Sequence, residues 1–572
     1  MPTIEVESAE LERLLGLTLH DDVSKLDEVL ALVKGELKLY DEKEGIVSVE
    51  MKDTNRPDLW SVEGLARGLQ GFLNKKKGLQ EYTVGKPIID IHVDSRLQTI
   101  RPFIGCCIIK NVKLTDAIIR GLMHLQDKLD QTNGRNRQKT SIGLYDFNLI
   151  TPPLSYTVVK PAETSFVPLG FTESMTLAEI LERHPKGIEY GHIVKKHSVY
   201  PILLDAKGKV LSFPPIINSN DLGKVTEETH NLLIEVTGTA IETVLNTVKL
   251  VSLALIDRGG EPYAANVHYK LDGSKVVTPS FANTLMSLNV AYANQILGLD
   301  LKGKRIGELL RTAGFGIAKV SHETVNVLIP CYRTDVMHQV DLIEDVAIAY
   351  GFNNIEPVWR DLPTTGCVGP EQRFIDKARE LMVGSGFQEI LTYTMTNPEN
   401  LFLKMNIIGK PEDKLARLGK TVEIANPKVV TMTCLRNWLL PSLMEFLSNN
   451  KSVEFPQRIF ELGKITQVDE SQETRTRDEA WLAAAVSHPN GNFSEIKSVL
   501  DSFFMNLGVA WQIKAASHPS FIDGRVGSVV TNGESIGFVG EINPQVLVAW
   551  QLENPTAVFE LNLASILSRK LL

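Results

Sequence analysis

The sequence contains few cysteines, and this scarcity argues against two classes of protein. Five cysteines occur in 572 residues, and no two of them are spaced as Cys-x-x-Cys. A disulfide framework or a zinc ribbon is built from more cysteines at short, regular spacings. We therefore expect a cytoplasmic protein whose fold depends on apolar cores.

Long apolar runs and a surplus of basic residues are also missing. The longest strongly apolar stretch, "LVSLALI" at 250–256, is far shorter than the roughly 20 residues that a membrane-spanning helix needs. We therefore expect no membrane span. A net charge of -9 argues against a chain that is basic throughout, so any nucleic-acid contact is expected on a local basic patch.

Motifs for nucleotide binding and nucleophilic catalysis are incomplete. "GLDLKGKR" at 298–305 has Arg305 where a phosphate-binding loop needs Ser or Thr, and "GFGIAK" at 314–319 lacks the third glycine of a dinucleotide site. We find no Gly-x-Ser-x-Gly elbow, and "SHETV" around His322 lacks the second histidine of a zinc protease. These absences disfavour a stand-alone ATP-dependent ligase, a serine hydrolase and a zinc protease.

Strand and helix patterns alternate along the chain, which predicts a multidomain protein of the α/β and α+β classes. Polar segments with glycine and proline divide it into four ranges, 1–82, 83–270, 271–356 and 357–572. The second range is rich in predicted strands, among them "PIIDIHV", "FIGCCIIKNV" and "LLIEVTGT", and it holds a predicted hairpin, "ILLDAKGKVLSF".

The third range is predicted to be a small helical module, and the fourth to combine helices with strands. A helix is predicted over "ANTLMSLNVAYANQILGL" at 282–299, at the start of the third range. In the fourth range, "QRFIDKARELMVGSGF" is a predicted helix, whereas "RIFELGKI", "SIGFVGEI" and "AVFELNL" are predicted strands.

The most unusual segment is "CYRTDVMHQVDLIEDVAIAYGFNNI" at 331–355. It holds four carboxylates after Arg333 and no later Lys or Arg. A helix over 336–350 would gather an apolar stripe from Val336, Val340, Ile343, Ala347 and Tyr350. Asp341, Glu344 and Asp345 would then lie on the broadly opposite face, and Asp335 could cap the helix start.

Two interpretations of this acidic helix remain open from the residues alone. The first is a solvated acidic face with Asp335 as the N-cap. The second is a site for a hard cation, because magnesium and calcium prefer oxygen ligands and magnesium commonly takes only one or two carboxylates plus waters. His338 is expected to face outward and not to act as a ligand.

The same segment resembles a motif of the beta subunits of phenylalanyl-tRNA synthetases. That family carries Pro-x-x-Arg-x-Asp, then Asp-Leu-Ile-Glu-Glu/Asp, then Tyr-Gly-Tyr/Phe-x-x-Ile, which here occupy 330–335, 341–345 and 350–355. Three further stretches are similar to elements of the family: "DTNRPDLWSVEGLARGL" at 53–69, "LRNWLLPSLMEFLSNNKSVEFPQRIFELGKI" at 435–465, and "IGFVGEINPQVL" with the following "VFELNL". In order, they cover nearly the whole chain.

Two features favour the archaeal or eukaryotic branch of the family. "LQDKLDQTNGRNRQKTSIGLYDFN" at 125–148 resembles that branch, and the sequence lacks the appended tRNA-binding modules of bacterial beta subunits.

The resemblance implies a division of labour with an alpha subunit, in a heterotetramer of two alpha and two beta chains. The alpha subunit would bind ATP and activate phenylalanine. Residues 357–572 would form a class II synthetase-like core with an antiparallel sheet and no catalytic motifs, so no residue of this chain is predicted to catalyse activation. Arg436 is expected to serve packing or subunit contact.

The resemblance also implies a magnesium ion shared with the alpha subunit. Its expected ligands in this chain are the four carboxylates of the acidic segment: Asp335, Asp341, Glu344 and Asp345. Asp345 stands where many members of the family have Glu.

The strand-rich range resembles the editing module of the family, which hydrolyses tyrosine wrongly attached to the phenylalanine tRNA. The matching positions are Leu203, Ser212, Glu235 and Thr237. Glu235 could accept a hydrogen bond from the phenol, Ser212 or Thr237 could orient substrate or water, and Leu203 could form a pocket wall. Taken singly, Ser212 is better explained as an ordinary residue of a hairpin strand and Thr237 as a helix-entry residue, and only the resemblance of the whole module supports a role in editing.

Beside that module, "GRNRQK" forms a compact basic patch of Arg135, Arg137 and Lys139. Two interpretations of this patch remain open: it contacts tRNA phosphates, or it is a solvated charged loop. Two functions therefore compete. The chain is either a synthetase subunit with an active editing site, or a structural or tRNA-binding partner subunit without active editing.

Overall fold

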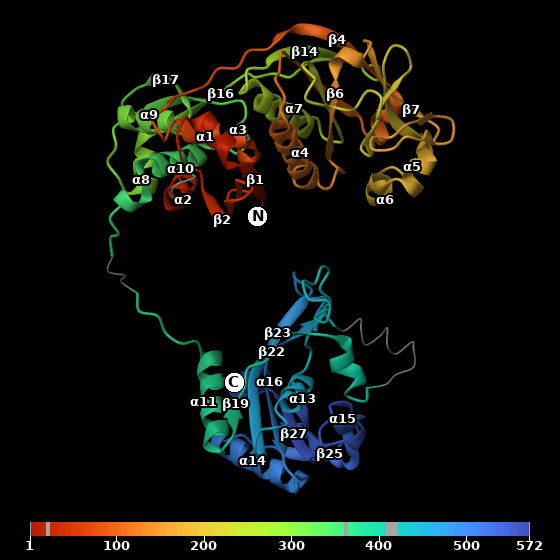
Figure 1. Cartoon of the computed structure of the whole chain (residues 1–572). Coiled ribbons are helices and arrows are strands. Elements are labelled where there is room, and N and C mark those ends of the chain that lie inside the picture. Colours follow the sequence, from red (N-terminus) through yellow and green to blue (C-terminus); the bar gives the residue numbers. More distant parts are fainter. Residues whose placement is uncertain (1, 19–22, 360–363, 408–420, 571–572) are drawn as a thin grey trace. The chain divides into compact units, whose positions relative to one another are not determined.

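A computed structural model of the protein describes residues 2–18, 23–359, 364–407 and 421–570. Within these ranges the chain forms two compact units, Met1–Val358 and Trp359–Leu572, and each is described by itself (Figure 1). Among the described residues, no helix has the length and apolar character that crossing a membrane requires. The predicted mixed α/β, multidomain character is confirmed.

The first unit opens with a small α/β module. Its antiparallel sheet has the order β1-β3-β2. The strands are β1 (Thr3–Glu7), β2 (Gly35–Asp41) and β3 (Ile46–Met51), and the helices are α1 (Ser8–Leu15), α2 (Val23–Ala31) and α3 (Val62–Gln70). Every second residue of β3 is buried, as a strand with one face on a core requires.

A ten-stranded sheet forms the second module, with the order β12-β11-β10-β7-β4-β14-β5-β13-β6 and β15 paired to β14. Its strands are β4 (Gly85–Val93), β5 (Phe103–Lys110), β6 (Thr140–Asp146), β7 (Leu154–Val159), β10 (Tyr200–Leu204), β11 (Val210–Phe213), β12 (Ile217–Asn218), β13 (Leu232–Gly238), β14 (Glu261–Tyr269) and β15 (Lys275–Thr278). The predicted strands and the predicted hairpin of this range are confirmed.

Both faces of the central strands are buried, which explains their continuous apolar runs. Cys107 and Ile109 of β5 face a core shared with helices α4 (Asp116–Gln131) and α7 (Ile241–Ile256), whereas Cys106 and Ile108 face a second core. The helices α5 (Leu177–Arg183) and α6 (Pro185–Tyr190) and the short strands β8 (Ser165–Phe166) and β9 (Met175–Thr176) complete the module (Figure 1).

The two edges of this sheet meet, because strands at opposite ends of its order are joined by hydrogen bonds. Asn218 of β12 donates through Nδ2 to the carbonyl of Leu144 in β6, at 3.3 Å. The hydroxyl of Tyr145 in β6 lies 3.4 Å from Oδ1 of Asn218. The sheet is therefore curled, and side chains of α4, of Leu144 in β6 and of Asn218 in β12 line one cavity beside this seam.

The third module has a three-stranded sheet of order β16-β18-β17. Its elements are β16 (Thr284–Asn289), α8 (Val290–Leu297), α9 (Gly303–Thr312), β17 (Gly316–Val320), β18 (Thr324–Ile329) and α10 (Gln339–Tyr350). The prediction of one helix over 282–299 is wrong in its first half, because residues 284–289 pair with β18 along their whole length. The boundary predicted at 270 is also too early, since β15 belongs to the preceding sheet.

The second unit is built on a seven-stranded sheet of order β19-β22-β23-β27-β26-β25-β24, antiparallel except for β19 and β22. The strands are β19 (Gln388–Glu389), β22 (Gln457–Val468), β23 (Thr476–Ser487), β24 (Gln512–Ala515), β25 (Phe521–Thr531), β26 (Glu534–Ile542) and β27 (Thr556–Asn562), with a separate pair of β20 (Met395–Thr396) and β21 (Cys434–Leu435). The helices are α11 (Pro370–Gly384), α13 (Leu440–Asn449), α14 (Phe493–Leu507), α15 (Pro544–Ala549) and α16 (Leu563–Lys570). Apolar cores lie on both faces of the sheet.

Candidate functional site

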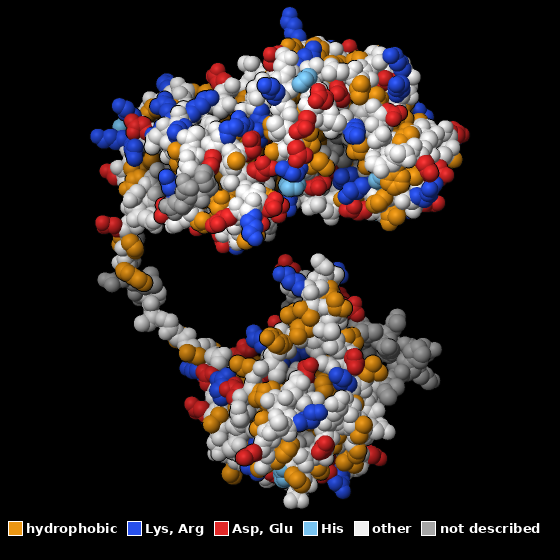
Figure 2. All heavy atoms as spheres, in the orientation of Figure 1, with side chains coloured by type: hydrophobic (Ala, Val, Ile, Leu, Met, Phe, Trp, Pro, Cys, Tyr) orange, Lys and Arg blue, Asp and Glu red, His pale blue; other side chains and the backbone are white. Residues whose placement is uncertain are grey.

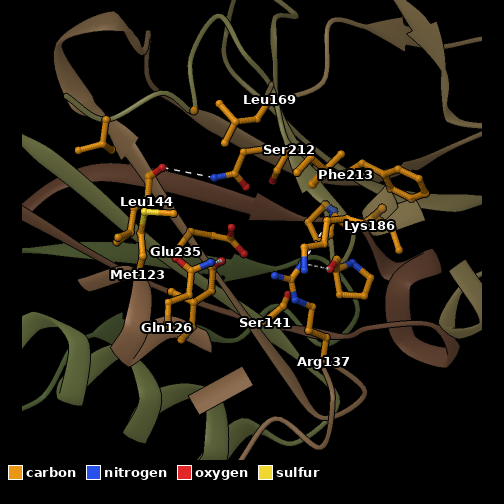
Figure 3. Close-up of a pocket in the computed structure, with 18 of the residues that line it drawn as sticks. Met123, Gln126, Arg137, Ser141, Leu144, Leu169, Lys186, Ser212, Phe213 and Glu235 are labelled. Carbon is orange, nitrogen blue, oxygen red and sulfur yellow. Dashed lines mark hydrogen bonds between the residues drawn. The ribbon is translucent and has the colours of Figure 1, made fainter. Parts of the chain in front are cut away.

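A cavity of about 400 Å³ lies at the seam of the curled sheet. Helix α4 supplies Ile119, Leu122, Met123 and Gln126 to one wall, and the segment 212–218 supplies another. Figure 3 shows Met123, Leu144, Leu169, Ser212 and Glu235 around this space. Its walls are predominantly apolar with a few polar groups, which is typical of a site for a small organic ligand.

Two of the four predicted editing residues, Ser212 and Glu235, line this cavity. Each is 2 % exposed. The hydroxyl of Tyr145 donates to Oε2 of Glu235 at 2.8 Å, whereas Oε1 of Glu235 and Oγ of Ser212 have no hydrogen-bond partner among the described residues. Burial raises the pKa of Glu235 to about 7, against the opposing effect of the Tyr145 hydrogen bond. The carboxyl group can therefore either accept or donate a hydrogen bond near neutral pH.

The other two, Leu203 and Thr237, lie outside the cavity wall. Leu203 is directly opposite Ser212 in the sheet, but its side chain is fully buried in an apolar core. Thr237 is also fully buried, and its Oγ1 accepts a hydrogen bond from Nε of Arg101 at 2.9 Å. The two residues support the site from behind and do not contact the cavity.

Sequence reasoning missed Arg101, a fully buried guanidinium that organises this support. Its Nη2 donates to Oγ of Ser141, which lines the cavity, and to the carbonyl of Thr237, at 3.0 and 2.8 Å. Its Nη1 donates to the carbonyl of Arg137 at 3.0 Å. Because these acceptors come from three separate segments, no local sequence pattern could have indicated the role of Arg101.

The predicted basic patch is not a patch of three exposed cations. Arg135 is exposed and Lys139 half-buried, but Arg137 is buried and lines the cavity. Its Nη1 donates to the carbonyls of Pro215 and Ile216, at 3.2 and 3.0 Å. Arg137 is therefore not a solvated loop residue, and its contact with tRNA stays a prediction. Arg137 joins the loop 134–139 to the opposite wall of the cavity.

Arg137 owes this inward direction to its backbone and to two further partners. Residues 135–137 all have positive φ, between 49° and 63°, so the loop turns tightly. The guanidinium of Arg137 lies 3.1 Å from Oδ2 of Asp130 and 4.5 Å from the ring centre of Tyr190. It thus connects α4, α6 and the segment 215–216.

The acidic segment is the second candidate site, and its carboxylates are not left uncompensated. Arg333 donates to Asp335 at 2.9 and 2.7 Å and to Asp345 at 2.6 Å, and its guanidinium lies over the ring of Phe315. Glu344 forms an ion pair with Lys34 of the first module. Burial raises the pKa of Asp345, and Arg333 opposes that shift.

The helix itself also differs from its prediction. It begins at Gln339, and Asp341, not Asp335, accepts hydrogen bonds at its start, from the backbone N–H groups of Met337 and His338 at 2.8 and 2.7 Å. Asp345 is buried, whereas Val340 of the predicted apolar stripe is exposed. The spacing along an ideal helix could not predict this burial, because it results from the ion pair between Asp345 and Arg333.

These contacts bear on the expected magnesium ion. In the part of the chain that the structure describes, no three His, Cys, Asp or Glu side chains are grouped so that they could hold a metal. The four carboxylates point to different partners, and two of them share one arginine. As arranged in this chain, the residues do not fit a four-carboxylate metal site.

The second unit places Arg436 inside the protein, as its expected packing role requires. Its Nη2 lies 2.8 Å from Oε1 of Glu461, and its Nη1 donates to Oγ1 of Thr392 at 2.7 Å. Glu560 accepts hydrogen bonds from the backbone N–H groups of Leu439 and Leu440, at 2.7 and 3.1 Å, at the start of α13. All three charged side chains are buried, so they have internal structural partners.

Comparison with protein families gives two matches that together cover the C-terminal half of the chain. Residues 286–352 match the family model of the tRNA synthetase B5 domain, and residues 355–563 match that of the phenylalanyl tRNA synthetase beta chain CLM domain. The fold and these domains define a subunit of an aminoacyl-tRNA synthetase.

Similarity to individual proteins extends over nearly the full length. The chain is 43 % identical over 563 residues to the phenylalanine–tRNA ligase beta subunit of Pyrococcus abyssi, covering 98 % of this chain and 99 % of the relative. It is 40 % identical to that of Thermococcus kodakarensis, covering 99 % of each, and 38 % identical to that of Archaeoglobus fulgidus, covering 99 % and 98 %. The chain therefore belongs to the phenylalanine–tRNA ligase beta subunit family.

A solved structure also resembles the first unit. The crystal structure of an N-terminal fragment of the phenylalanyl-tRNA synthetase beta subunit from Pyrococcus horikoshii aligns with a TM-score of 0.59 and 38 % identity. The alignment covers 61 % of this chain and 99 % of the fragment. The predicted family is confirmed by these comparisons, and the relatives named here are archaeal.

Proposed function

We propose that this chain assembles with an alpha subunit and also edits the charged tRNA. In the proposed editing reaction, the cavity between α4 and the sheet seam binds and hydrolyses the ester of tyrosine with the phenylalanine tRNA. The observation that carries this proposal is the buried Glu235 carboxyl in an otherwise apolar cavity, with Oε1 unpaired among the described residues. A tyrosyl phenol can fill that unpaired position, but a phenyl ring cannot.

This difference supplies selectivity for the wrong product. Leaving a buried carboxyl oxygen unpaired costs about 1–3 kcal/mol or more, so the phenyl ring is rejected by the same group that accepts the phenol. In the reaction, water adds to the ester carbonyl, the bond to the terminal ribose breaks, and the ribose hydroxyl leaves with a proton. Ser212 and the nearby backbone would orient the ester and the water.

The proposed partner is an alpha subunit that binds ATP and activates phenylalanine, in a heterotetramer of two alpha and two beta chains. In the second unit, apolar side chains are exposed in and beside the β20–β21 pair: Leu391 at 84 %, Tyr393 at 75 % and Val430 at 86 %. Apolar groups gathered on a surface are typical of a protein interface. A subunit with this role in translation would work in the cytoplasm.

The magnesium ion shared with the alpha subunit belongs to this proposal only for the assembled complex. Asp335 and Asp345 both pair with Arg333, so the carboxylates for a partner to reach would be Asp341 and the exposed Glu344, which the ion would have to draw away from Lys34. The remaining oxygen ligands would come from water or from the alpha subunit.

Contact with tRNA is proposed for a few individual basic residues and not for a broad basic surface. Basic and acidic side chains are interspersed over the visible face of each unit (Figure 2). Arg135 and Lys139 remain candidates for phosphate contact, together with Lys186 and Lys224, which line the cavity.

The test uses tRNA already charged with tyrosine or with phenylalanine. The chain, alone and combined with its alpha subunit, is mixed with each, and release of the amino acid is timed. Hydrolysis of the tyrosyl ester at least tenfold faster than that of the phenylalanyl ester supports editing. Phenylalanine attachment by the mixture without any hydrolysis of the tyrosyl ester would instead leave the chain as a structural and tRNA-binding subunit.

A further inference from the structure

We propose that Tyr145 is a positioning residue that holds the Glu235 carboxyl group so that Oε1 faces the ligand in the cavity. This inference rests on the proposed editing function and assigns a discriminating role to a residue that the sequence did not single out. Tyr145 does not line the cavity; it would act only through Glu235.

The hydrogen bond between the two side chains fixes one of the two carboxyl oxygens. Glu235 lies on β13 and Tyr145 on the neighbouring strand β6, and Tyr145 Oη donates to Glu235 Oε2 at 2.8 Å. The remaining oxygen, Oε1, has no partner among the described residues. Because Tyr145 is fully buried and packed in an apolar core, its hydroxyl cannot swing away from Glu235.

A neighbouring glycine provides the space for this pair. Gly143 is directly opposite Glu235 in the register of β6 and β13. A Cβ atom at this position would lie 2.3 Å from Oη of Tyr145 and 2.6 Å from Oε2 of Glu235. Both distances are too short for unbonded atoms, so only glycine permits the observed hydrogen bond.

The same bond also favours the charged form of the carboxyl group. Burial raises the pKa of Glu235 to about 7, and the Tyr145 hydrogen bond lowers it, since the donor favours the charged form. Loss of the hydroxyl would therefore raise the pKa further. A role in packing alone would not produce such a shift.

Asn218 extends this arrangement to the opposite edge of the sheet. Its Oδ1 lies 3.4 Å from the Tyr145 hydroxyl, and its Nδ2 donates to the carbonyl of Leu144. Asn218 itself lines the cavity. The Tyr145 hydroxyl therefore lies between the Glu235 carboxyl, which it holds, and Asn218, which joins the two edges of the sheet.

The test is the substitution Tyr145→Phe in the full chain combined with its alpha subunit. Hydrolysis of tyrosyl-tRNA and of phenylalanyl-tRNA is measured between pH 5.5 and 8.5. We expect kcat/KM for the tyrosyl ester to fall by about ten- to hundredfold, as for loss of a hydrogen bond to a charged group, with less change for the phenylalanyl ester. The pH profile should shift to higher pH.

The matched control is Tyr269→Phe, which removes a hydroxyl that donates to the carbonyl of Ile104 in the same sheet, away from the cavity. It should leave the rates, their ratio and the pH profile unchanged. Unchanged values for Tyr145→Phe in an active enzyme would overturn the positioning role. Absence of hydrolysis in the unsubstituted enzyme would overturn the editing function and this inference with it.

A second substitution keeps the test independent of folding. Gly143→Ala should disrupt the pair by steric contact, and adding Tyr145→Phe should relieve the shortest of its three close contacts, at 2.3 Å, while those to Oε2 of Glu235 and to the ring carbon Cζ of residue 145 remain. We expect the double variant to recover part of the lost thermal stability without recovering selectivity for the tyrosyl ester. Recovery of selectivity without the Tyr145 hydroxyl would contradict the inference.

Discussion

Arg333 donates hydrogen bonds to both carboxylate oxygens of Asp345, at 3.4 and 2.6 Å, although the two residues are separated by the start of a helix. Both side chains are buried. The main positive charge that compensates the acidic helix is therefore Arg333, which belongs to the same segment, 331–355. This pair explains how the helix can fold onto the third module with a carboxylate on its buried face.

The first prediction concerns the stability of that helix. Arg333→Met should leave Asp335 and Asp345 without their closest cation, and breaking a buried pair by removing one partner costs about 3–5 kcal/mol. Hydrogen exchange of peptides covering 339–350 should accelerate accordingly. Arg305→Met, which breaks an exposed pair with Glu308, serves as the control and should cost about 0–1 kcal/mol. Equal protection in both variants would show that Arg333 does not stabilise α10.

The second prediction concerns magnesium. Because the carboxylates already have partners within the chain, adding magnesium to the chain alone should not change its thermal midpoint relative to EDTA. A ligand at 100 times its Kd would stabilise a folded protein by about 2.7 kcal/mol, which a melting curve detects. A saturable rise that is lost in the double variant Asp341→Asn, Glu344→Gln would refute this. The same titration with the alpha subunit present tests whether the complex creates the site.

The central strands of the second module were predictable because both of their faces are buried. Segments such as "FIGCCIIKNV" and "LLIEVTGT" are rich in apolar residues because nearly every side chain of these strands is buried, and a strand is therefore indicated by composition. The stretch 284–289 was predicted as part of a helix because its side chains, half apolar and half polar, precede a genuine helix without a break. Pairing with β18, about 40 residues later, decided its conformation.

Side-chain direction was less predictable than the elements that carry the residues. Glu235 and Ser212 were predicted to share a site and do line the same cavity, since the resemblance covers both strands. Arg137 was not, because its direction depends on carbonyls of Pro215 and Ile216, almost 80 positions away. A charged residue in a polar loop normally faces water, and only tertiary contacts reveal the exception.

The third prediction separates a structural role of Arg137 from contact with tRNA. Arg137→Met should weaken the wall at 215–216 and lower kcat/KM for hydrolysis of tyrosyl-tRNA by about tenfold, as expected for losing hydrogen bonds from a charged group. The dependence of tRNA binding on salt should stay the same. Arg135→Met, in the same loop but exposed, should change that salt slope by about one if it contacts a phosphate. A changed slope for Arg137→Met would indicate that it does meet tRNA.

The fourth prediction concerns Glu560, whose carboxyl accepts two backbone hydrogen bonds at the start of α13. Burial raises its pKa from 4.5 to about 7, although the N–H groups of Leu439 and Leu440 oppose the shift. In the unfolded chain the pKa returns toward 4.5, so between these values the folded state binds more protons than the unfolded state. Stability associated with Glu560 should therefore be highest at low pH and decline as pH rises through about 7.

Glu560→Gln removes this titration and so provides the measurement. The unfolding free energy of the original chain minus that of the variant should fall by about 2.5 kcal/mol between pH 5 and 8, as measured by urea denaturation with tryptophan fluorescence. Glu470→Gln, at an exposed carboxylate, is the control substitution measured in the same way. If the Glu560 difference were independent of pH, the carboxyl would be charged at all these pH values. The buried Arg436, 2.8 Å from the neighbouring Glu461, would then have to stabilise that charge.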